Sequence, residues 1–282
     1  LVLLAENNTC YANLMKIVSK GFVDGYYYKP RVDMEVLETY HEGIIALSAC
    51  LAGEVQRYLT RGMYEEAKST ALKYEKCFGK GNFFLELQDH GIPEQTQVNQ
   101  QLLRMHQELG IDLVATNDVH YTYENDAEPH DILLCLQTGK KLSDENRMRY
   151  EGGQYYVKSE EEMRALFPYA LEAVENTQKI ADRCHVEIEF GVTKLPRFDV
   201  PDGYTSWEYL NKLCYEGLDE RYSSERVQEL KPRLEYELSV IQKMGYVDYF
   251  LIVWDFIHFA RENDIMVGPG RGSAAGSLVS YT

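Results

Sequence analysis

The sequence lacks the features that mark membrane-spanning and disulfide-bonded proteins. Its most apolar stretch, residues 249–260, is short and is interrupted by Asp255 and His258, so no membrane span is expected. Its 6 cysteines are scattered without any Cys-x-x-Cys spacing, which argues against a disulfide framework and predicts a reduced, cytoplasmic chain. An initiator methionine is also lacking, and residues 1–5 and 273–282 predict a strand and an unfinished helix. We therefore expect an internal part of a longer protein.

Basic residues are scarce as well. Lys and Arg number 29 against 45 Asp and Glu, which gives a formal net charge of −16. A surface this acidic does not favour binding of nucleic acid through its phosphates, unless the binding regions lie elsewhere. The length of 282 residues predicts one large or two modest domains, and the apolar fraction of 45% is ordinary for a globular protein.

Apolar runs and helical periodicity alternate in the first part of the chain. This alternation predicts βα units with a mostly parallel sheet or barrel. We expect strands at residues 1–5, 43–49, 83–87 and 113–116, with helices at 11–20, 53–62, 64–78 and 94–109 between them. From Ser159, a plausible N-cap with Glu162 as its capping-box partner, the pattern is helical.

The helical part predicts helices at residues 160–166, 171–184, 207–222, 226–245 and 249–263, then a strand at 265–267 and a final helix. Residues 190–204 contain Gly191, Pro196, Pro201 and Gly203 without periodicity, which indicates a linker. We place the domain boundary there, with domains at 1–190 and 191–282.

Polar side chains follow three successive predicted strands. Cys50 follows the second, Gln88, Asp89 and His90 follow the third, and Asp118 and His120 follow the fourth. Because residues two apart in an extended segment point to one face, Asp118 and His120 can reach one ion together. Thiolate, imidazole and carboxylate are zinc ligands, whereas oxygen and nitrogen also suit manganese.

Each of these residues also has a structural interpretation. Cys50 can be a small buried apolar residue, and Asp118 with His120 can form a hydrogen-bonded turn. Glu86, near the end of the third strand, and His90 can simply be a solvated strand end. Taken together at three strand ends, the residues favour a metal site, with a catalytic or a purely structural role for the ion left open.

The segment at residues 265–279 predicts a strand, a glycine-rich turn and a helix. Glycines at 268, 270, 272 and 276 allow close approach of a ligand, and a helix start presents unpaired N–H groups to phosphate. Arg271 adds a charged fork suited to phosphate oxygens, and Ser273 and Ser277 add hydroxyls. No Gly-Lys-[Ser/Thr] follows, so the segment is not a P-loop. A tight turn that packs a helix onto a strand is the alternative.

The run Gly268-Pro-Gly-Arg-Gly-Ser-Ala-Ala-Gly-Ser-Leu-Val279 resembles the Gly-Ser region of the palm in the DnaE-type polymerase III alpha family. Residues 244–257 resemble the helical lead-in of the same family. Upstream, residues 1–5, 26–31, 47–54, 84–91 and 115–121 resemble its PHP (polymerase and histidinol phosphatase) domain. The resemblance covers nearly the whole chain in order.

The resemblance implies an α/β fold: a partial, distorted TIM-like barrel of seven strands, followed by the mainly helical start of a polymerase-beta-like palm. It implies that Cys50, Asp118 and His120 match metal-site positions holding Zn²⁺ or Mn²⁺, with further ligands before Leu1; Glu86 and His90 are not carried over. It further implies that Arg271, Gly272, Ser273, Gly276 and Ser277 hold the triphosphate of the incoming nucleotide. The catalytic aspartates, which bind Mg²⁺, are expected beyond Thr282, so no catalytic residue is expected here.

These implications predict a part of a replicative DNA polymerase. Its partners would be primer–template DNA, dNTPs, the sliding clamp and other replisome subunits. A stand-alone PHP-type phosphoesterase explains Cys50, Asp118 and His120 but not residues 226–282. A metal-braced scaffold that docks a proofreading exonuclease, or a barrel that is itself a 3′–5′ exonuclease, is compatible with the polymerase.

Overall fold

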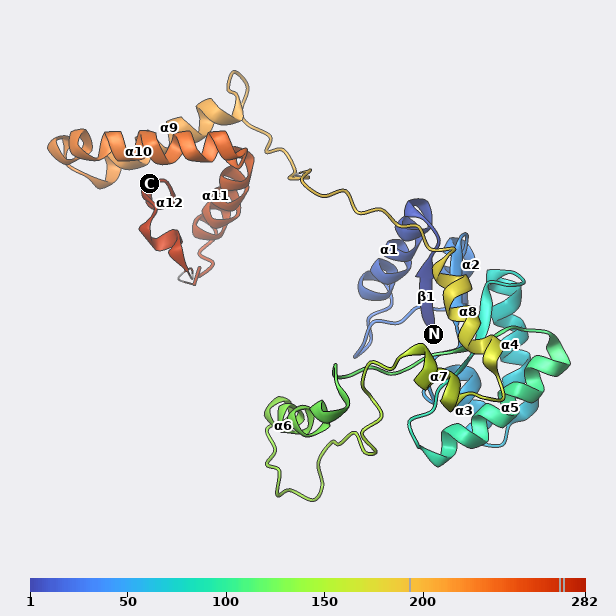
Figure 1. Ribbon diagram of the computed structural model, residues 1–282. Coiled ribbons are helices and arrows are strands. Elements are labelled where there is room, and N and C mark those ends of the chain that lie inside the picture. The colour runs from blue at the N-terminus through green and yellow to red at the C-terminus, as the bar shows by residue number, and fades with distance from the viewer. Residues whose placement is uncertain (193, 269, 271) are drawn as a thin grey trace. The chain divides into compact units, whose positions relative to one another are not determined.

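The computed structural model describes residues 1–192, 194–268, 270 and 272–282 (Figure 1). Contacts divide the chain into two units, Leu1–Ile188 and Glu189–Thr282, which we call unit 1 and unit 2. Unit 1 contains a sheet with helices around it, and unit 2 is helical. No helix in the described ranges has the length and the apolar character needed to cross a membrane.

The sheet of unit 1 has the four strands that the sequence predicts, with ends within two residues of the predicted ones. Their order across the sheet is β1 (Val2–Ala5), β2 (Ile44–Leu47), β3 (Phe83–Leu87) and β4 (Leu113–Ala115). β1 pairs antiparallel with β2, whereas β2, β3 and β4 are parallel. Every residue of β2, β3 and β4 is buried, as expected for parallel strands covered on both faces.

Helices connect these strands and lie around the sheet, with one exception. In chain order they are α1 (Asn8–Val23), α2 (Met34–Tyr40), α3 (Glu54–Thr60), α4 (Tyr64–Phe78), α5 (Pro93–Leu109), the 3₁₀ helix η1 (Glu124–Asp126), α6 (Ala127–Thr138), α7 (Glu160–Leu166) and α8 (Leu171–Ala181). The exception is α6, which contacts mainly η1. The sequence patterns did not predict α2 or the bounds of α6.

Local signals explain why α5 and α7 form where they do. α5 begins with Pro93 in its first turn and ends before Gly110, which adopts φ 70° as a left-handed cap. α7 starts at the predicted capping box, in which the Glu162 amide donates to the Ser159 hydroxyl and the Ser159 amide donates to the Glu162 carboxylate. Both helices thereby satisfy backbone groups that would otherwise lack partners.

The end of unit 1 is bonded to its beginning. Arg183 Nε donates to the Glu6 carboxylate at 2.9 Å, and the His185 amide donates to the Glu6 carbonyl at 2.7 Å. The Glu187 amide and carbonyl pair with the side chain of Asn8 at 2.8 and 2.9 Å. These contacts fasten the segment that follows α8 beside the start of α1.

Unit 2 consists of α9 (Ser206–Arg221), α10 (Ser224–Met244), α11 (Val247–Glu262), the 3₁₀ helix η2 (Ser273–Gly276) and α12 (Leu278–Tyr281). Its core is built from the buried faces of these helices and includes Leu210, Cys214, Leu218, Leu234, Leu238, Leu251, Leu278 and Val279.

Two expectations for unit 2 are wrong. Residues 265–267 form no strand, because no other strand lies beside them among the described residues, and all three side chains are exposed. The continuous helix expected over residues 273–282 is broken at Ser277, whose extended backbone separates η2 from α12.

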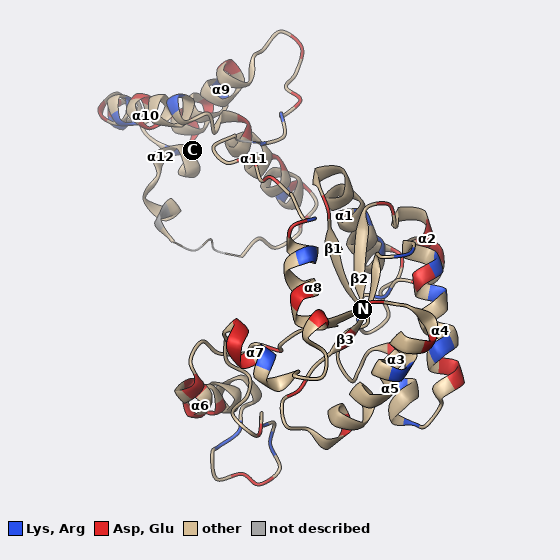
Figure 2. Ribbon diagram, turned by 45° about the vertical axis from the view of Figure 1, so that its right-hand side comes forward, with Lys and Arg blue, Asp and Glu red and all other residues tan. Residues whose placement is uncertain are grey.

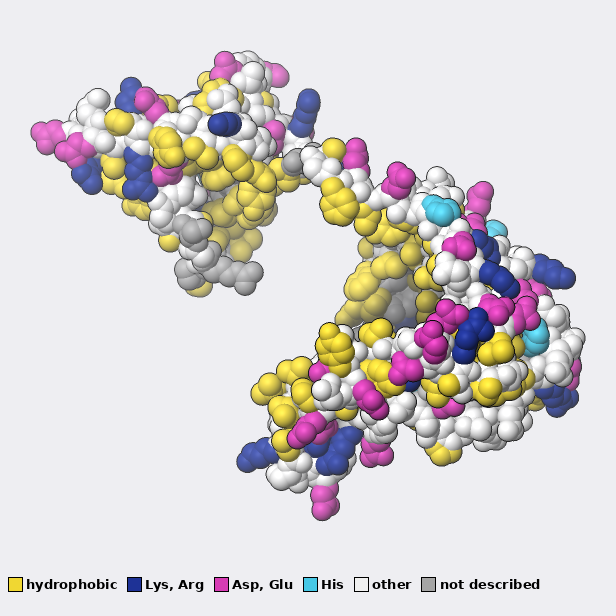
Figure 3. All heavy atoms as spheres, viewed as in Figure 1, with side chains coloured by type: hydrophobic (Ala, Val, Ile, Leu, Met, Phe, Trp, Pro, Cys, Tyr) yellow, Lys and Arg dark blue, Asp and Glu magenta, His cyan; other side chains and the backbone are white. Residues whose placement is uncertain are grey.

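Charged side chains are spread over both units, whereas unit 2 has a large exposed apolar surface. Acidic side chains lie on helices of both units with Lys and Arg among them (Figure 2). A large apolar surface lies on unit 2 around α11, where Tyr249, Phe256 and Phe259 are exposed (Figure 3). Exposed apolar surface of this extent is typical of contact surfaces rather than of solvent-facing helices.

We predict that Leu102→Ala in α5 lowers the free energy of unfolding by about 2–5 kcal/mol. The Leu102 side chain is fully buried in the core of unit 1, so its removal leaves a cavity. Leu72→Ala in α4 is the matched control, because Leu72 is 43% exposed. Urea denaturation followed by circular dichroism gives both values, and equal effects of the two substitutions would contradict the assignment of the core.

Candidate functional site

The predicted site residues follow the carboxyl ends of the three parallel strands. Parallel pairing brings these ends to the same edge of the sheet. At this edge the Ser48 amide donates to the Phe84 carbonyl, and the Thr116 amide donates to the Leu87 carbonyl. Functional side chains commonly gather at this edge in βα folds. Cys50, His90 and Asp118 therefore belong to three neighbouring loops.

Glu86, which lies in β3, is buried and bonded to both neighbouring strand ends. One of its carboxylate oxygens accepts from the Ala49 amide at 2.9 Å. The other accepts from the Thr116 hydroxyl and from the Gln88 side-chain amide. Only 5% of Glu86 is exposed, so its interpretation as a solvated strand end is wrong.

His90 is likewise buried rather than solvated, at 3% exposure. Its Nδ1 lies 3.0 Å from the side-chain nitrogen of Gln95, and its Nε2 lies 3.0 Å from Asn117 Oδ1 and 3.1 Å from the Asp118 amide nitrogen. The ring stacks on Tyr155 with a centroid separation of 4.6 Å. Burial lowers the pKa of His90 and favours the neutral ring.

Asp118 and His120 form the close pair that their spacing predicts. His120 Nδ1 lies 2.9 Å from the Asp118 carbonyl oxygen and 3.8 Å from its carboxylate. An Nδ1–H that donates to this carbonyl leaves the lone pair of Nε2 free, which is the usual arrangement for a histidine metal ligand. The His120 ring also packs against Tyr150, with a centroid separation of 4.2 Å. The backbone amide of His120 donates to the Tyr155 carbonyl.

Cys50 is exposed, and it lines a cavity of about 10 Å³ together with Glu86 and Gln88. The buried-residue alternative for Cys50 is therefore wrong. Within the described ranges, no three His, Cys, Asp or Glu side chains lie close enough together to hold a metal ion. The predicted set of Cys50, Asp118 and His120 offers suitable donor atoms but does not form a complete metal site by itself.

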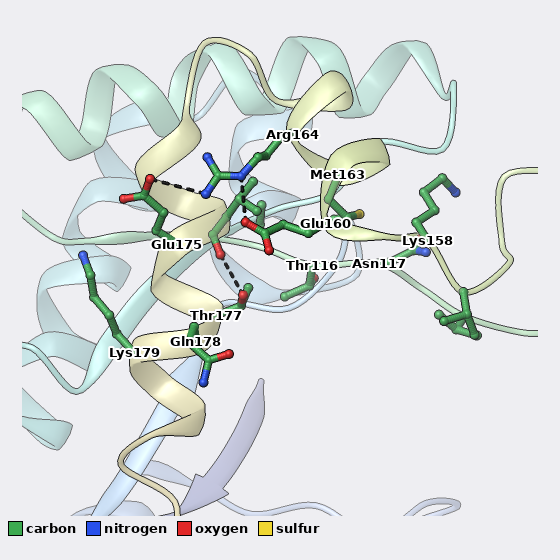
Figure 4. Close-up of a pocket in the computed structure, with 14 residues that line it drawn as sticks. Thr116, Asn117, Lys158, Glu160, Met163, Arg164, Glu175, Thr177, Gln178 and Lys179 are labelled. Carbon is green, nitrogen blue, oxygen red and sulfur yellow. Dashed lines mark hydrogen bonds and ion pairs between the residues drawn. The ribbon is translucent and has the colours of Figure 1, made fainter.

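A larger cavity of about 710 Å³ lies beside Thr116 and Asn117, between the end of β4, α7 and α8 (Figure 4). Three of its charged residues pair with one another, since Arg164 lies 2.8 Å from Glu160 and 3.5 Å from Glu175, whereas Lys158 and Lys179 also line the cavity outside these pairs. The cavity adjoins the loop that carries Asp118, but it does not include Asp118 itself.

The glycine-rich segment is described only in part. Arg271, the predicted phosphate fork, lies outside the described residues, as does the side chain of Ser273. Gly272 adopts φ 85°, a backbone conformation that favours glycine. The carbonyl of Gly276 accepts a hydrogen bond from Arg233 of α10.

Glu237 of α10 accepts hydrogen bonds from the donor groups at the start of α12. Its carboxylate accepts from the Ser277 hydroxyl at 2.9 Å and from the amides of Leu278 and Val279 at 2.7 and 3.1 Å. Burial favours the neutral carboxyl, but the bonds from Arg233, Ser277 and the two amides outweigh it and hold the pKa of Glu237 below its ordinary value. A phosphate at Ser277 would have to compete with this carboxylate.

Sequence reasoning missed several residues that shape both regions. Ser48 and Thr116 bond to the backbone or side chain of Glu86, and Gln56 donates to Ser48 at 2.6 Å. The sequence did contain a signal for Ser48 and Thr116, because each is a hydroxyl residue directly after a buried strand. Nothing in the local pattern links Glu237 to Ser277, because 40 residues separate them.

Comparison with known proteins finds matches at both ends of the chain. Residues 1–90 match the model of the PHP domain, and residues 208–282 match that of the bacterial DNA polymerase III alpha NTPase domain. The DNA polymerase III alpha subunits of Treponema pallidum and Borreliella burgdorferi are each 48% identical over the whole chain, which covers 24% of their lengths. The Thermus aquaticus subunit is 38% identical, and the chain covers 28% of it.

We predict that Glu237→Gln lowers the free energy of unfolding of unit 2 by about 1–3 kcal/mol at pH 7, because a charged acceptor for several donors is lost. With its pKa depressed, Glu237 stabilises the fold above the unfolded-state pKa of about 4.3, and this contribution is lost as the pH falls through the lower folded-state value. The variant should therefore lose less stability than the wild type on acidification.

Urea denaturation at pH 7 and pH 3 tests this prediction. Glu235→Gln, at an exposed position of the same helix, is the control. Equal free energies of unfolding for Glu237→Gln and wild type at pH 7 would contradict the prediction.

Proposed function

Because the chain belongs to the bacterial DNA polymerase III alpha family and covers 24% of the length of two of its relatives, we propose that it is the part of a replicative polymerase that contains most of the PHP domain and the start of the palm. We assign residues 1–190 to the PHP domain and residues 191–282 to the start of the palm. The observation that carries the proposal is the identity of 48% over all 282 residues, with the two domain models matched in this order.

In the longer protein we propose template-directed DNA synthesis from dNTPs on primer–template DNA. Arg271, Gly272, Ser273, Gly276 and Ser277 would bind the triphosphate through the guanidinium, the hydroxyls and the backbone amides. Mg²⁺, held by aspartates outside the described residues, would supply charge stabilisation for the transfer. We expect the sliding clamp and other replisome subunits as partners, and the cytoplasm as the location.

For the PHP domain we propose that Cys50, Asp118 and His120 contribute ligands to a Zn²⁺ or Mn²⁺ ion. The support is the donor set, together with the Nδ1 contact of His120 that leaves Nε2 free. The remaining ligands would come from elsewhere in the longer protein. Such a site would serve either a 3′–5′ exonuclease or a structural scaffold. A stand-alone phosphoesterase is disfavoured by the polymerase match of residues 208–282.

We expect Arg271→Ala in the full-length protein to lower kcat/KM for nucleotide incorporation by about 10- to 100-fold, because a charge-assisted contact to the triphosphate is lost. Steady-state primer extension with varied dNTP concentration measures this. The control is Arg261→Ala, which removes an exposed arginine from the last turn of α11. Incorporation kinetics that do not change in Arg271→Ala would remove this residue from the triphosphate site.

We also expect Cys50→Ala to weaken binding of Zn²⁺ or Mn²⁺ to the full-length protein by about 10-fold or more, because one ligand is removed. Elemental analysis after dialysis against a metal buffer gives the bound metal per chain. Cys184→Ala is the matched control, since Cys184 is a free, half-buried cysteine of the same unit. A stoichiometry equal to that of the wild type would exclude Cys50 from the ligands.

A further inference from the structure

Glu86 links the two loops that carry the predicted metal ligands. Its two carboxylate oxygens face opposite ways along the sheet edge: one accepts from the Ala49 amide, next to Cys50, and the other from the Thr116 hydroxyl, two residues before Asp118. Cys50 and Asp118 belong to different loops, and Glu86 lies on the strand between them. One side chain thus restrains both loops.

The burial of Glu86 depends on hydrogen bonds to both of its carboxylate oxygens. Glu86 is 5% exposed, and its carboxylate is bonded to an amide, a hydroxyl and the neutral side chain of Gln88. Burying a carboxylate among neutral donors is unfavourable unless each oxygen is well bonded. An apolar residue at this position of a fully buried strand would avoid that cost, so packing alone does not explain a glutamate here.

The backbone next to Cys50 carries a second cost. Ala49 adopts φ 67°, which is unfavourable by about 1–2 kcal/mol for a residue with a side chain. The bond from the Ala49 amide to Glu86 fixes this peptide, while Gln56 donates to the Ala49 carbonyl at 2.9 Å. The direction in which the chain enters Cys50 is therefore set by groups on two other elements.

We propose that Glu86 is a positioning residue that couples the Cys50 loop to the Asp118–His120 loop, so that their ligands are presented as one set. The inference rests on the metal site proposed above, but the coupling of the loops is a property of the chain that can be measured without metal. Glu86 itself contacts no ion in this role; it acts through Ala49 and Thr116.

Two measurements on the full-length protein test the proposal. Hydrogen–deuterium exchange, followed by mass spectrometry, reports on peptides that contain residues 48–51 and 115–118. Alkylation of Cys50 by iodoacetamide, with Zn²⁺ or Mn²⁺ titrated in, reports on metal binding as protection of the thiol. Cys50 suits this assay because it is the exposed member of the 6 cysteines, and the pKa of buried Cys214 is raised to about 11.

Glu86→Leu should accelerate exchange in both peptides, since both restraints are lost together. Glu86→Gln should restore slow exchange in both, because its carbonyl can accept from Ala49 and its amide can donate to the Thr116 hydroxyl. Ala49→Gly, which relieves the strain at positive φ and keeps both bonds of Glu86, should leave exchange in both peptides as slow as in the wild type. Ile17→Ala, a core substitution in α1 remote from the site, controls for general destabilisation.

The metal titration should show a dissociation constant about 10- to 100-fold higher in Glu86→Leu than in wild type. Faster exchange in only one peptide, the same pattern in Ile17→Ala, or no restoration in Glu86→Gln would overturn the coupling. Failure of the metal proposal gives a different result: Cys50 of the wild type would not be protected by either ion, while the paired exchange response to Glu86→Leu would persist.

Discussion

The parallel pairing of β2, β3 and β4 is the constraint on which the rest of unit 1 depends. It fixes the three strand ends at one edge, and so decides which loops can meet. Because each of these strands is buried on both faces, a polar side chain within them must find its partners inside the sheet layer. Glu86 meets this demand by bonding to the chain just beyond each neighbouring strand.

The two units use internal carboxylates in the same way, although their folds differ. Glu86 holds the amide of Ala49 in unit 1, and Glu237 holds the amides of Leu278 and Val279 in unit 2. Each joins segments that are far apart in the chain and that adjoin a region with a proposed ligand. Part of the acidic character of this chain therefore has a structural role.

The sequence predicted the elements whose signals are local. Periodicity and caps placed α4, α5 and α7 within one residue of their ends, and continuous apolar runs placed the four strands. Elements that depend on partners were predicted less well. Residues 265–267 have strand composition but no strand beside them, and Ser277 interrupts the last helix where the carboxylate of Glu237 meets it.

The candidate site shows the same division. Asp118 and His120 were predicted as a pair from their spacing, and the pair is present, because a two-residue spacing is local information. The burial of Glu86 and the neutral, stacked ring of His90 depend on strand register and on Tyr155, which lies 65 residues further along the chain. Their bonding could not be predicted without the fold.

The fastening of Arg183, His185 and Glu187 to Glu6 and Asn8 has a consequence for biosynthesis. These contacts span 177 to 179 residues of sequence. Glu6 and Asn8 can therefore form them only after nearly the whole of unit 1 has left the ribosome. At about 5–20 residues per second this delay amounts to roughly 10–40 s. During that time β1 and α1 are partly uncovered, whereas the bonds between α10 and α12 in unit 2 span only 41 to 42 residues and can form sooner after their first partner emerges.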